Sequence, residues 1–169
     1  MNTSNRLRLL VHIALLTALE IVLNRFCSIN TTGLKIGFSF VPIALCAMLY
    51  GSAPAAVCYA LADFLGAILF PTGSYHPGFT VSCAAMGAVY GLLLNRKSLG
   101  FLRYLIPTLI NCLIIGLFVN SLWIAMLYGS RTYWGWVIYR CVQELVLIPV
   151  NLALLPALER LAVLLKKVI

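Results

Sequence analysis

Long apolar runs are the feature that most constrains the fold of this chain. Hydrophobic residues make up 63% of its 169 residues, and charged residues make up only 9%. Soluble globular domains are about 45–50% apolar and about 25% charged, so a protein of this size cannot hide so much apolar surface in its own core. Part of that surface must face lipid, and the sequence predicts an integral membrane protein.

Six apolar stretches separated by short polar segments predict six transmembrane helices. A bilayer core of roughly 30 Å needs about 20 apolar residues per spanning helix, so six spans leave no room for a separate soluble domain. We therefore expect an all-α membrane protein with a single transmembrane domain over residues 1–169. The predicted spans cover approximately residues 7–26, 38–50, 55–70, 78–94, 104–127 and 134–165. The first apolar run has no obvious cleavage site and is expected to remain as a span.

The second and sixth spans are the least regular. The second is the shortest, and without it the basic clusters described next would fall on opposite sides of the membrane. The sixth is long and contains Pro149 and Pro156. Proline removes a backbone hydrogen bond and clashes with the preceding turn, so we expect this helix to kink or break near both prolines.

The distribution of basic residues predicts the orientation of the spans. With six spans, one side of the membrane carries eight basic residues, which are Arg6, Arg8, Arg96, Lys97, Arg103, Arg160, Lys166 and Lys167. The other side carries three, which are Arg25, Lys35 and Arg131. Lysine and arginine accumulate in cytoplasmic loops, so both termini are expected in the cytoplasm and the loops 27–37, 71–77 and 128–133 outside. The net charge of +8 therefore reflects topology, and no nucleic-acid partner is expected.

Four ionisable residues lie away from the ends of the predicted spans, at membrane depth, and need a physical reason, because each costs on the order of 2.5–3.5 kcal/mol to insert; Arg25 lies near a span end. Arg140 and Glu144 are four residues apart on one helical face and can pair, either as an internal brace or as part of a site. Glu20 and Asp63 are expected to be hydrogen-bonded between helices. The spacing of these residues gives no nucleophile–base pair and no metal-ligand cluster.

The six cysteines include no CxxC pair, and buried free cysteine behaves as a small hydrophobe. We therefore predict neither a disulfide framework nor a metal site. Together with the ionisable residues, this pattern predicts no enzyme activity and no cofactor.

Cations, aromatic rings and amides gather near the predicted outer ends of the spans. Aromatic faces can stack on a flat ring, and arginine can bind a carboxylate through two parallel hydrogen bonds. Any single Trp or Tyr here is better explained as part of the aromatic belt found at membrane–water interfaces. The three outer segments, however, also carry cations and few acids, and this favours an anionic ligand. The candidate binding residues are Arg25, Lys35, Phe38, Tyr75, Asn120, Trp123, Arg131, Tyr139 and Arg140.

Pairs of small residues four apart mark two helices for close packing. Ala14 and Ala18 form one pair in the first span, and Gly87 and Gly91 form another in the fourth. Such pairs allow two helix backbones to approach closely. The pattern alone serves equally well for packing within the chain and for contact with a partner.

Several segments together resemble the folate family of substrate-binding subunits of energy-coupling factor vitamin transporters. The segments are residues 23–26 (LNRF), 35–45 (KIGFSFVPIAL), 62–73 (ADFLGAILFPTG), 120–123 (NSLW) and 140–149 (RCVQELVLIP). The resemblance extends over most of residues 10–150, and the block 35–80 is its most specific part. This chain departs from the family at Gln143, where lysine is common.

The resemblance implies a six-helix subunit of a prokaryotic plasma membrane that binds its vitamin from outside with high affinity. It also implies assembly with a membrane coupling subunit and two ATPase subunits, with Ala14 and Ala18 matching the family motif that packs on the coupling subunit. Folate or a related pteridine is the expected ligand. Riboflavin, thiamine and pantothenate subunits share the architecture and remain alternatives, as do a small structural membrane subunit and an intramembrane enzyme.

Overall fold

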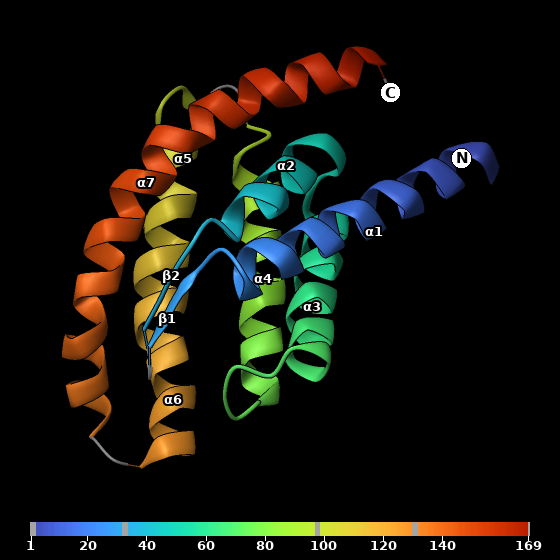
Figure 1. Ribbon diagram of the computed structural model, residues 1–169. Coiled ribbons are helices and arrows are strands. Elements are labelled where there is room, and N and C mark those ends of the chain that lie inside the picture. Colours follow the sequence, from blue (N-terminus) through green and yellow to red (C-terminus); the bar gives the residue numbers. More distant parts are fainter. Residues whose placement is uncertain (1–2, 32–33, 97–98, 130–131, 169) are drawn as a thin grey trace.

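The computed structural model describes residues 3–31, 34–96, 99–129 and 132–168 (Figure 1). Nearly all of its regular structure is helical, as the sequence predicts. The elements, in chain order, are α1 (Thr3–Arg25), β1 (Ile29–Thr31), β2 (Leu34–Ile36), α2 (Phe40–Tyr50), α3 (Ser52–Leu69), α4 (Pro77–Leu93), α5 (Leu102–Leu109), the π-helix η2 (Ile110–Val119), α6 (Asn120–Tyr128) and α7 (Tyr133–Val168).

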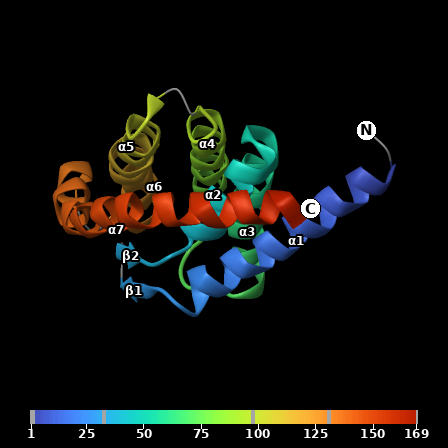
Figure 2. The same ribbon diagram turned by 90° about the horizontal axis from the view of Figure 1, so that it is seen from above.

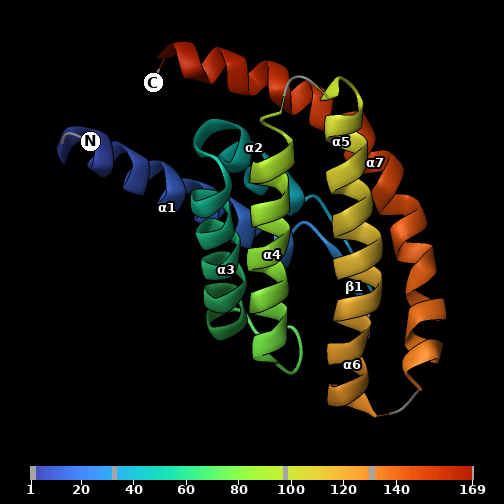
Figure 3. The ribbon, with the colours of Figure 1, turned by 180° about the vertical axis from the view of Figure 1, so that it is seen from behind.

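Four helical segments are long and apolar enough to cross a membrane. They are Arg6–Arg25, Ser52–Leu69, Leu102–Tyr128 and Tyr133–Lys167. The third consists of α5, η2 and α6, which follow one another as a single rod (Figure 3). Two further helices, α2 and α4, are apolar but shorter. Seen from behind, α3 lies beside α4, and the α5–η2–α6 rod lies beside α7 (Figure 3).

The predicted outer loop 27–37 contains a small antiparallel hairpin. Strands β1 and β2 pair Ile29 with Ile36 and Asn30 with Lys35. β-Branched residues such as these isoleucines suit an extended backbone, which explains why the segment pairs with itself. The following helix begins at Phe40, so Phe38 lies before α2 and outside the span predicted to include it.

The long α7 bends without breaking at its prolines. Pro149 and Pro156 both lie inside one continuous helix, and the helix turns over the end of the molecule where the two termini lie (Figure 1). Seen from above, its C-terminal part crosses α2 (Figure 2). The predicted kink is therefore present as a change of direction, and the break is not.

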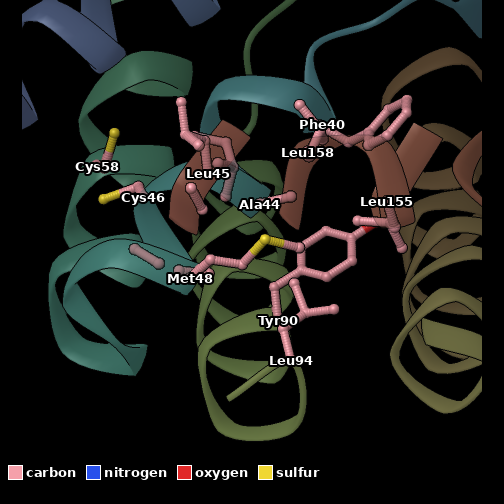
Figure 4. Packing of buried hydrophobic residues seen from close by; sticks show 14 of the residues in the cluster. Phe40, Ala44, Leu45, Cys46, Met48, Cys58, Tyr90, Leu94, Leu155 and Leu158 are labelled. Atoms are coloured by element: carbon pink, nitrogen blue, oxygen red, sulfur yellow. The ribbon is translucent and has the colours of Figure 1, made fainter. Parts of the chain in front are cut away.

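The C-terminal part of α7 closes an apolar core over α2. Ile43, Ala44 and Leu155 are all fully buried in this cluster, and Tyr90 and Leu158 also contribute to it (Figure 4). The shortest predicted span is thus among the most buried elements. The core occupies the end of the molecule that carries the termini, and polar side chains are left to line the space at the opposite end.

The two pairs of small residues have different surroundings. A Cβ atom added at Gly87 would lie 2.5 Å from the carbonyl oxygen of Ala55, and one added at Gly91 would lie 2.3 Å from the Cα of Ser52. The glycines of α4 therefore allow close packing against α3 within the chain. Ala14 and Ala18, by contrast, lie on the exposed face of α1.

Candidate functional site

A cavity of about 310 Å³ lies between the helices and is lined in part by the connection from α3 to α4, at the end of the molecule opposite the termini (Figure 1). Its walls come from the end of α1, the β1–β2 hairpin, the start of α2, the helices α3 and α4 with the connection between them, the α5–η2–α6 rod and the first half of α7. Small-molecule sites generally occupy 300–1,000 Å³, so a ligand of modest size fits.

Two cations line the wall formed by α1 and the hairpin. Arg25 ends α1, where a positive charge suits the helix dipole, and its Nη1 donates a hydrogen bond of 2.6 Å to Oγ1 of Thr72. Lys35 lies in β2, and its backbone N–H donates a 2.8 Å hydrogen bond to Oε1 of Gln143. That bond fixes the hairpin to α7.

The ammonium group of Lys35 is poised to respond to an anion. Burial and, to a smaller extent, the nearby charge of Arg25 lower the pKa of Lys35 to about 8, against the opposing effect of Glu20 and Asp63. A bound anion would stabilise the charged ammonium and raise its pKa again. The hairpin therefore presents a cation whose charge is sensitive to what occupies the cavity.

Two acids lie on or behind the same wall. Asp63 lines the cavity and accepts a 2.8 Å hydrogen bond from Oγ1 of Thr80, which links α3 to α4 as the sequence predicts. Glu20 is fully buried behind the cavity, and its Oε1 accepts a 2.8 Å hydrogen bond from Nδ2 of Asn24. This bond stays within α1, so for Glu20 the hydrogen bond observed is local and does not join two helices.

The wall from α7 presents Arg140, Gln143 and Glu144. The Nη2 of Arg140 donates to the backbone oxygen of Gly116 at 3.1 Å, and Arg140 also interacts electrostatically with Glu144, as their spacing predicts. Oε1 of Glu144 accepts from Nε2 of Gln143 at 3.2 Å. Oε2 of Glu144 is buried and has no hydrogen-bond partner among the described residues. Buried polar atoms are normally satisfied, so the Glu144 carboxyl, which also interacts with the thiol of Cys112, is a candidate acceptor for a ligand.

The π-helix η2 and the first residue of α6 turn four residues toward the cavity. Asn111, Cys112, Gly116 and Asn120 all line the cavity. In an α-helix, at about 100° per residue, these four positions would spread over roughly 180°. The wider i→i+5 turn of a π-helix, at about 4.4 residues, narrows the spread to roughly 80°. Like Glu144, Asn120 presents a buried oxygen, Oδ1, with no partner among the described residues.

The cavity contains five of the nine residues predicted to bind a ligand. They are Arg25, Lys35, Tyr75, Asn120 and Arg140. Arg131 lies outside the described residues. Phe38 and Tyr139 do not line the cavity; Phe38 is half exposed before α2, and the ring of Tyr139 packs edge-on against Trp136 at 6.0 Å.

Trp123 faces α4 and is not part of the cavity lining. Its ring stacks on His76 with centroids 5.1 Å apart, and its Nε1 donates a 3.0 Å hydrogen bond to Oγ of Ser82. A Cβ added at Gly78 would lie 2.5 Å from the same ring. The indole therefore fills the space between α6 and α4, where the absence of a side chain at Gly78 admits it.

Several cavity residues were not among those predicted from the sequence. Asn111 and Asn151 each interrupt an apolar helix, and both reach the cavity together with Tyr90. The hydroxyl of Tyr90 donates to Oδ1 of Asn151 at 2.8 Å. The sequence did contain a signal for these two residues, which is a single amide side chain within an apolar run. A buried amide needs a hydrogen-bond partner. Among the described residues, no group of three His, Cys, Asp or Glu side chains could hold a metal ion.

Comparisons with known proteins agree on one family. The family described as "ECF transporter, substrate-specific component" matches residues 8–159. A "Folate transporter FolT" of Clostridium novyi (strain NT) is 33% identical over 146 residues, which cover 86% of this chain and 84% of that protein. A "Folate transporter FolT" of Leuconostoc mesenteroides is 26% identical over 152 residues, which cover 87% and 82% of the two chains.

Solved structures share the fold over nearly the whole chain. A crystal structure of FolT bound with folic acid superposes with a TM-score of 0.83 at 29% identity and covers 94% of both chains. The S-component for biotin from an ECF-type ABC transporter superposes with a TM-score of 0.71 at 18% identity, covering 99% of this chain and 95% of the other. At that identity, the second likeness concerns the fold alone.

Proposed function

This chain belongs to the family of ECF transporter substrate-specific components, and from that premise we propose that its cavity binds folate or a related pteridine from outside the cell. The family consists of membrane transporter subunits and not of enzymes. The two relatives named above are folate transporters, and the similar crystal structure holds folic acid. The chemistry of this chain's own cavity supports the same ligand.

The observation that carries the proposal is one cavity lined both by two cations and by buried acceptor oxygens. Folate joins a flat pterin, which has amino and ring N–H donors, to a tail with two carboxylates. Arg25 and Lys35, on the wall of α1 and the hairpin, would offset the carboxylates. The buried oxygens of Asn120 and Glu144, on the wall of α6 and α7, would accept from the pterin. Tyr75 would offer a ring face beside them.

A folate-binding measurement tests the proposal directly. Detergent-purified protein is titrated with folic acid by calorimetry, comparing the wild type with Arg25→Ala and Lys35→Ala. A hydrogen bond to a charged group contributes about 1.5–3 kcal/mol, so each variant should bind roughly 10- to 100-fold more weakly. Phe38→Ala is the matched control, because Phe38 belongs to the same connecting segment but does not line the cavity.

The outcomes separate the alternatives. A wild-type protein that binds no folate would refute the proposal, and mass spectrometry of a co-purified riboflavin, thiamine or pantothenate would reassign the vitamin. A protein that binds no small molecule and still assembles with partners would be a structural subunit. If Phe38→Ala weakens binding as much as Arg25→Ala does, the cavity is not the site.

The proposed topology has six membrane spans with both termini in the cytoplasm of a prokaryote. The four long segments and the two shorter apolar helices supply the spans, and both termini lie at the same end of the molecule (Figure 1). The end of α4, the start of α5 and the C-terminal end of α7 lie at that end of the molecule (Figure 3), and the sequence there includes Arg96, Arg103 and Lys166, which agrees with the positive-inside rule. The cavity then opens outward. Labelling single cysteines placed at residue 73 and at residue 100 from either side of the membrane tests this orientation.

The proposed partners are a membrane coupling subunit and two ATPase subunits, which would drive import. Ala14 and Ala18 lie on the exposed face of α1, where Leu10, Leu15 and Leu19 are also exposed. Small residues on such a face let a partner helix approach closely. If this face of α1 contacted only lipid, small residues would not be needed there. The presence of Ala14 and Ala18 therefore favours contact with another helix.

A further inference from the structure

The connection between α3 and α4 forms one side of the cavity mouth. Five consecutive residues, from Pro71 to Tyr75, line the cavity. A ligand that enters or leaves at this side must pass them. Two side-chain hydrogen bonds join the described residues 71–75 to the helices around them, one from Arg25 to Thr72 at 2.6 Å and the other between Tyr75 and Thr80 at 2.7 Å.

The second contact is part of a directional chain of hydroxyl groups. Oγ1 of Thr80 donates to Oδ2 of Asp63 at 2.8 Å. A hydroxyl carries a single proton, so Thr80 has none left for Tyr75. The phenol of Tyr75 must then be the donor in the 2.7 Å bond to Oγ1 of Thr80. The chain therefore runs from the connection to α4 and ends at a carboxylate of α3.

Successive hydrogen bonds of this kind polarise and strengthen one another. They also restrict the ring of Tyr75, which packs edge-on against Phe64 with centroids 6.3 Å apart. Tyr75 and Asp63 line the cavity, whereas Thr80 does not. Thr80 can therefore affect a ligand only through the two residues that it joins.

We propose that Thr80 is a positioning residue, which fixes Tyr75 at the cavity mouth and thereby slows the escape of the bound ligand. The inference rests on the proposed function, since it needs a ligand in the cavity. It adds a specific consequence for recognition. The phenol O–H of Tyr75 already donates its hydrogen bond to Thr80. Tyr75 can therefore offer a ligand its ring face and its oxygen lone pairs, but not a hydrogen-bond donor. The carboxylates of the ligand are left to Arg25 and Lys35.

The test compares ligand dissociation from Thr80→Val and Thr80→Ser proteins. Valine keeps the shape of threonine and removes the hydroxyl, whereas serine keeps the hydroxyl. Full-length protein in detergent is loaded with folic acid, and release into excess buffer is followed by stopped-flow tryptophan fluorescence. Loss of one net hydrogen bond should speed dissociation from Thr80→Val about 3- to 10-fold. Thr80→Ser should dissociate at close to the wild-type rate, and association should change less than dissociation in both.

A double-mutant cycle with Tyr75→Phe separates positioning from general damage. If the two hydroxyls act as one chain, removing both speeds dissociation no more than removing one. Multiplying effects, an unchanged rate in Thr80→Val, or a Thr80→Ser protein as fast as Thr80→Val would each overturn the proposal. If Thr80→Val does not fold, Tyr75→Phe supplies the decisive rate, because its hydroxyl belongs to an exposed bond. Failure of the wild type to bind folic acid would instead refute the proposed function.

Discussion

Replacing Gly66 with alanine should weaken ligand binding without weakening the fold. Gly66 lies in α3 and does not line the cavity. A Cβ added there would lie 3.0 Å from Nε of Arg25, 3.3 Å from its Nη2 and 3.6 Å from its Cζ. The new methyl group would therefore press on the guanidinium of the cation that we place against the ligand.

The size of the effect follows from these distances. Non-bonded atoms separate comfortably at about 3.5–4.0 Å, so the guanidinium must retreat by about 0.5 Å. Its 2.6 Å bond to Thr72 restricts that movement. A hydrogen bond to a charged group contributes about 1.5–3 kcal/mol, and we expect roughly 1 kcal/mol of it to be lost, which is about a fivefold rise in Kd. Alanine in place of glycine favours a helix by about 0.5–1 kcal/mol, which offsets the tighter packing.

Calorimetric titration with folic acid measures the affinity, and thermal unfolding in detergent measures the stability. The control is the same substitution in an Arg25→Ala background, where no guanidinium remains to be displaced. Gly66→Ala should then have no further effect on Kd. Equal weakening in both backgrounds, or unchanged affinity in the wild-type background, would refute the role given to Arg25. A fall of the unfolding midpoint by many degrees would refute the separation of binding from folding.

Three further predictions concern other parts of the molecule. Folate affinity should fall as the pH rises past about 8, because Lys35, whose pKa is lowered to about 8, loses its charge there. The affinity should fall by at most about tenfold per pH unit. The affinity of the Lys35→Met protein, measured over the same pH range, should change less. Gly87→Val should lower the unfolding midpoint, since its Cβ would lie 2.5 Å from the backbone oxygen of Ala55 and overpacking costs about 1–3 kcal/mol. Ala18→Trp should leave folate binding intact and abolish co-purification with the coupling subunit, whereas co-purification at the wild-type level would exclude this face of α1 as the contact.

The long helices could be predicted from the sequence because their cause is local. A run of about 20 apolar residues needs lipid wherever the rest of the chain lies, and each predicted span overlaps a helix of the structure. The hairpin at residues 29–36 and the π-helix at 110–119 could not be predicted. The hairpin depends on pairing between two short strands and on the hydrogen bond from Lys35 to Gln143 of α7. The π-helix depends on how its neighbours pack around the cavity.

Neighbouring residues of one helix show where prediction of the site ends. Asn120 and Trp123 are three residues apart and were both expected to bind a ligand, yet Asn120 lines the cavity and Trp123 packs over Gly78. Sequence periodicity shows which residues share a helical face. It does not show what that face meets.

The sequence by itself determined that this is a membrane protein and that cations lie near the ends of its apolar runs, since solvation and charge belong to each residue wherever it lies. The tertiary structure decided which of those cations line one cavity. It also decided which of the two pairs of small residues packs against another helix of the same chain. Gly87 lies against α3 and Ala18 does not pack within the chain. The physical reason is that convergence depends on the rotation and bend of whole helices, which the packing of the distant core around α2 and α7 fixes.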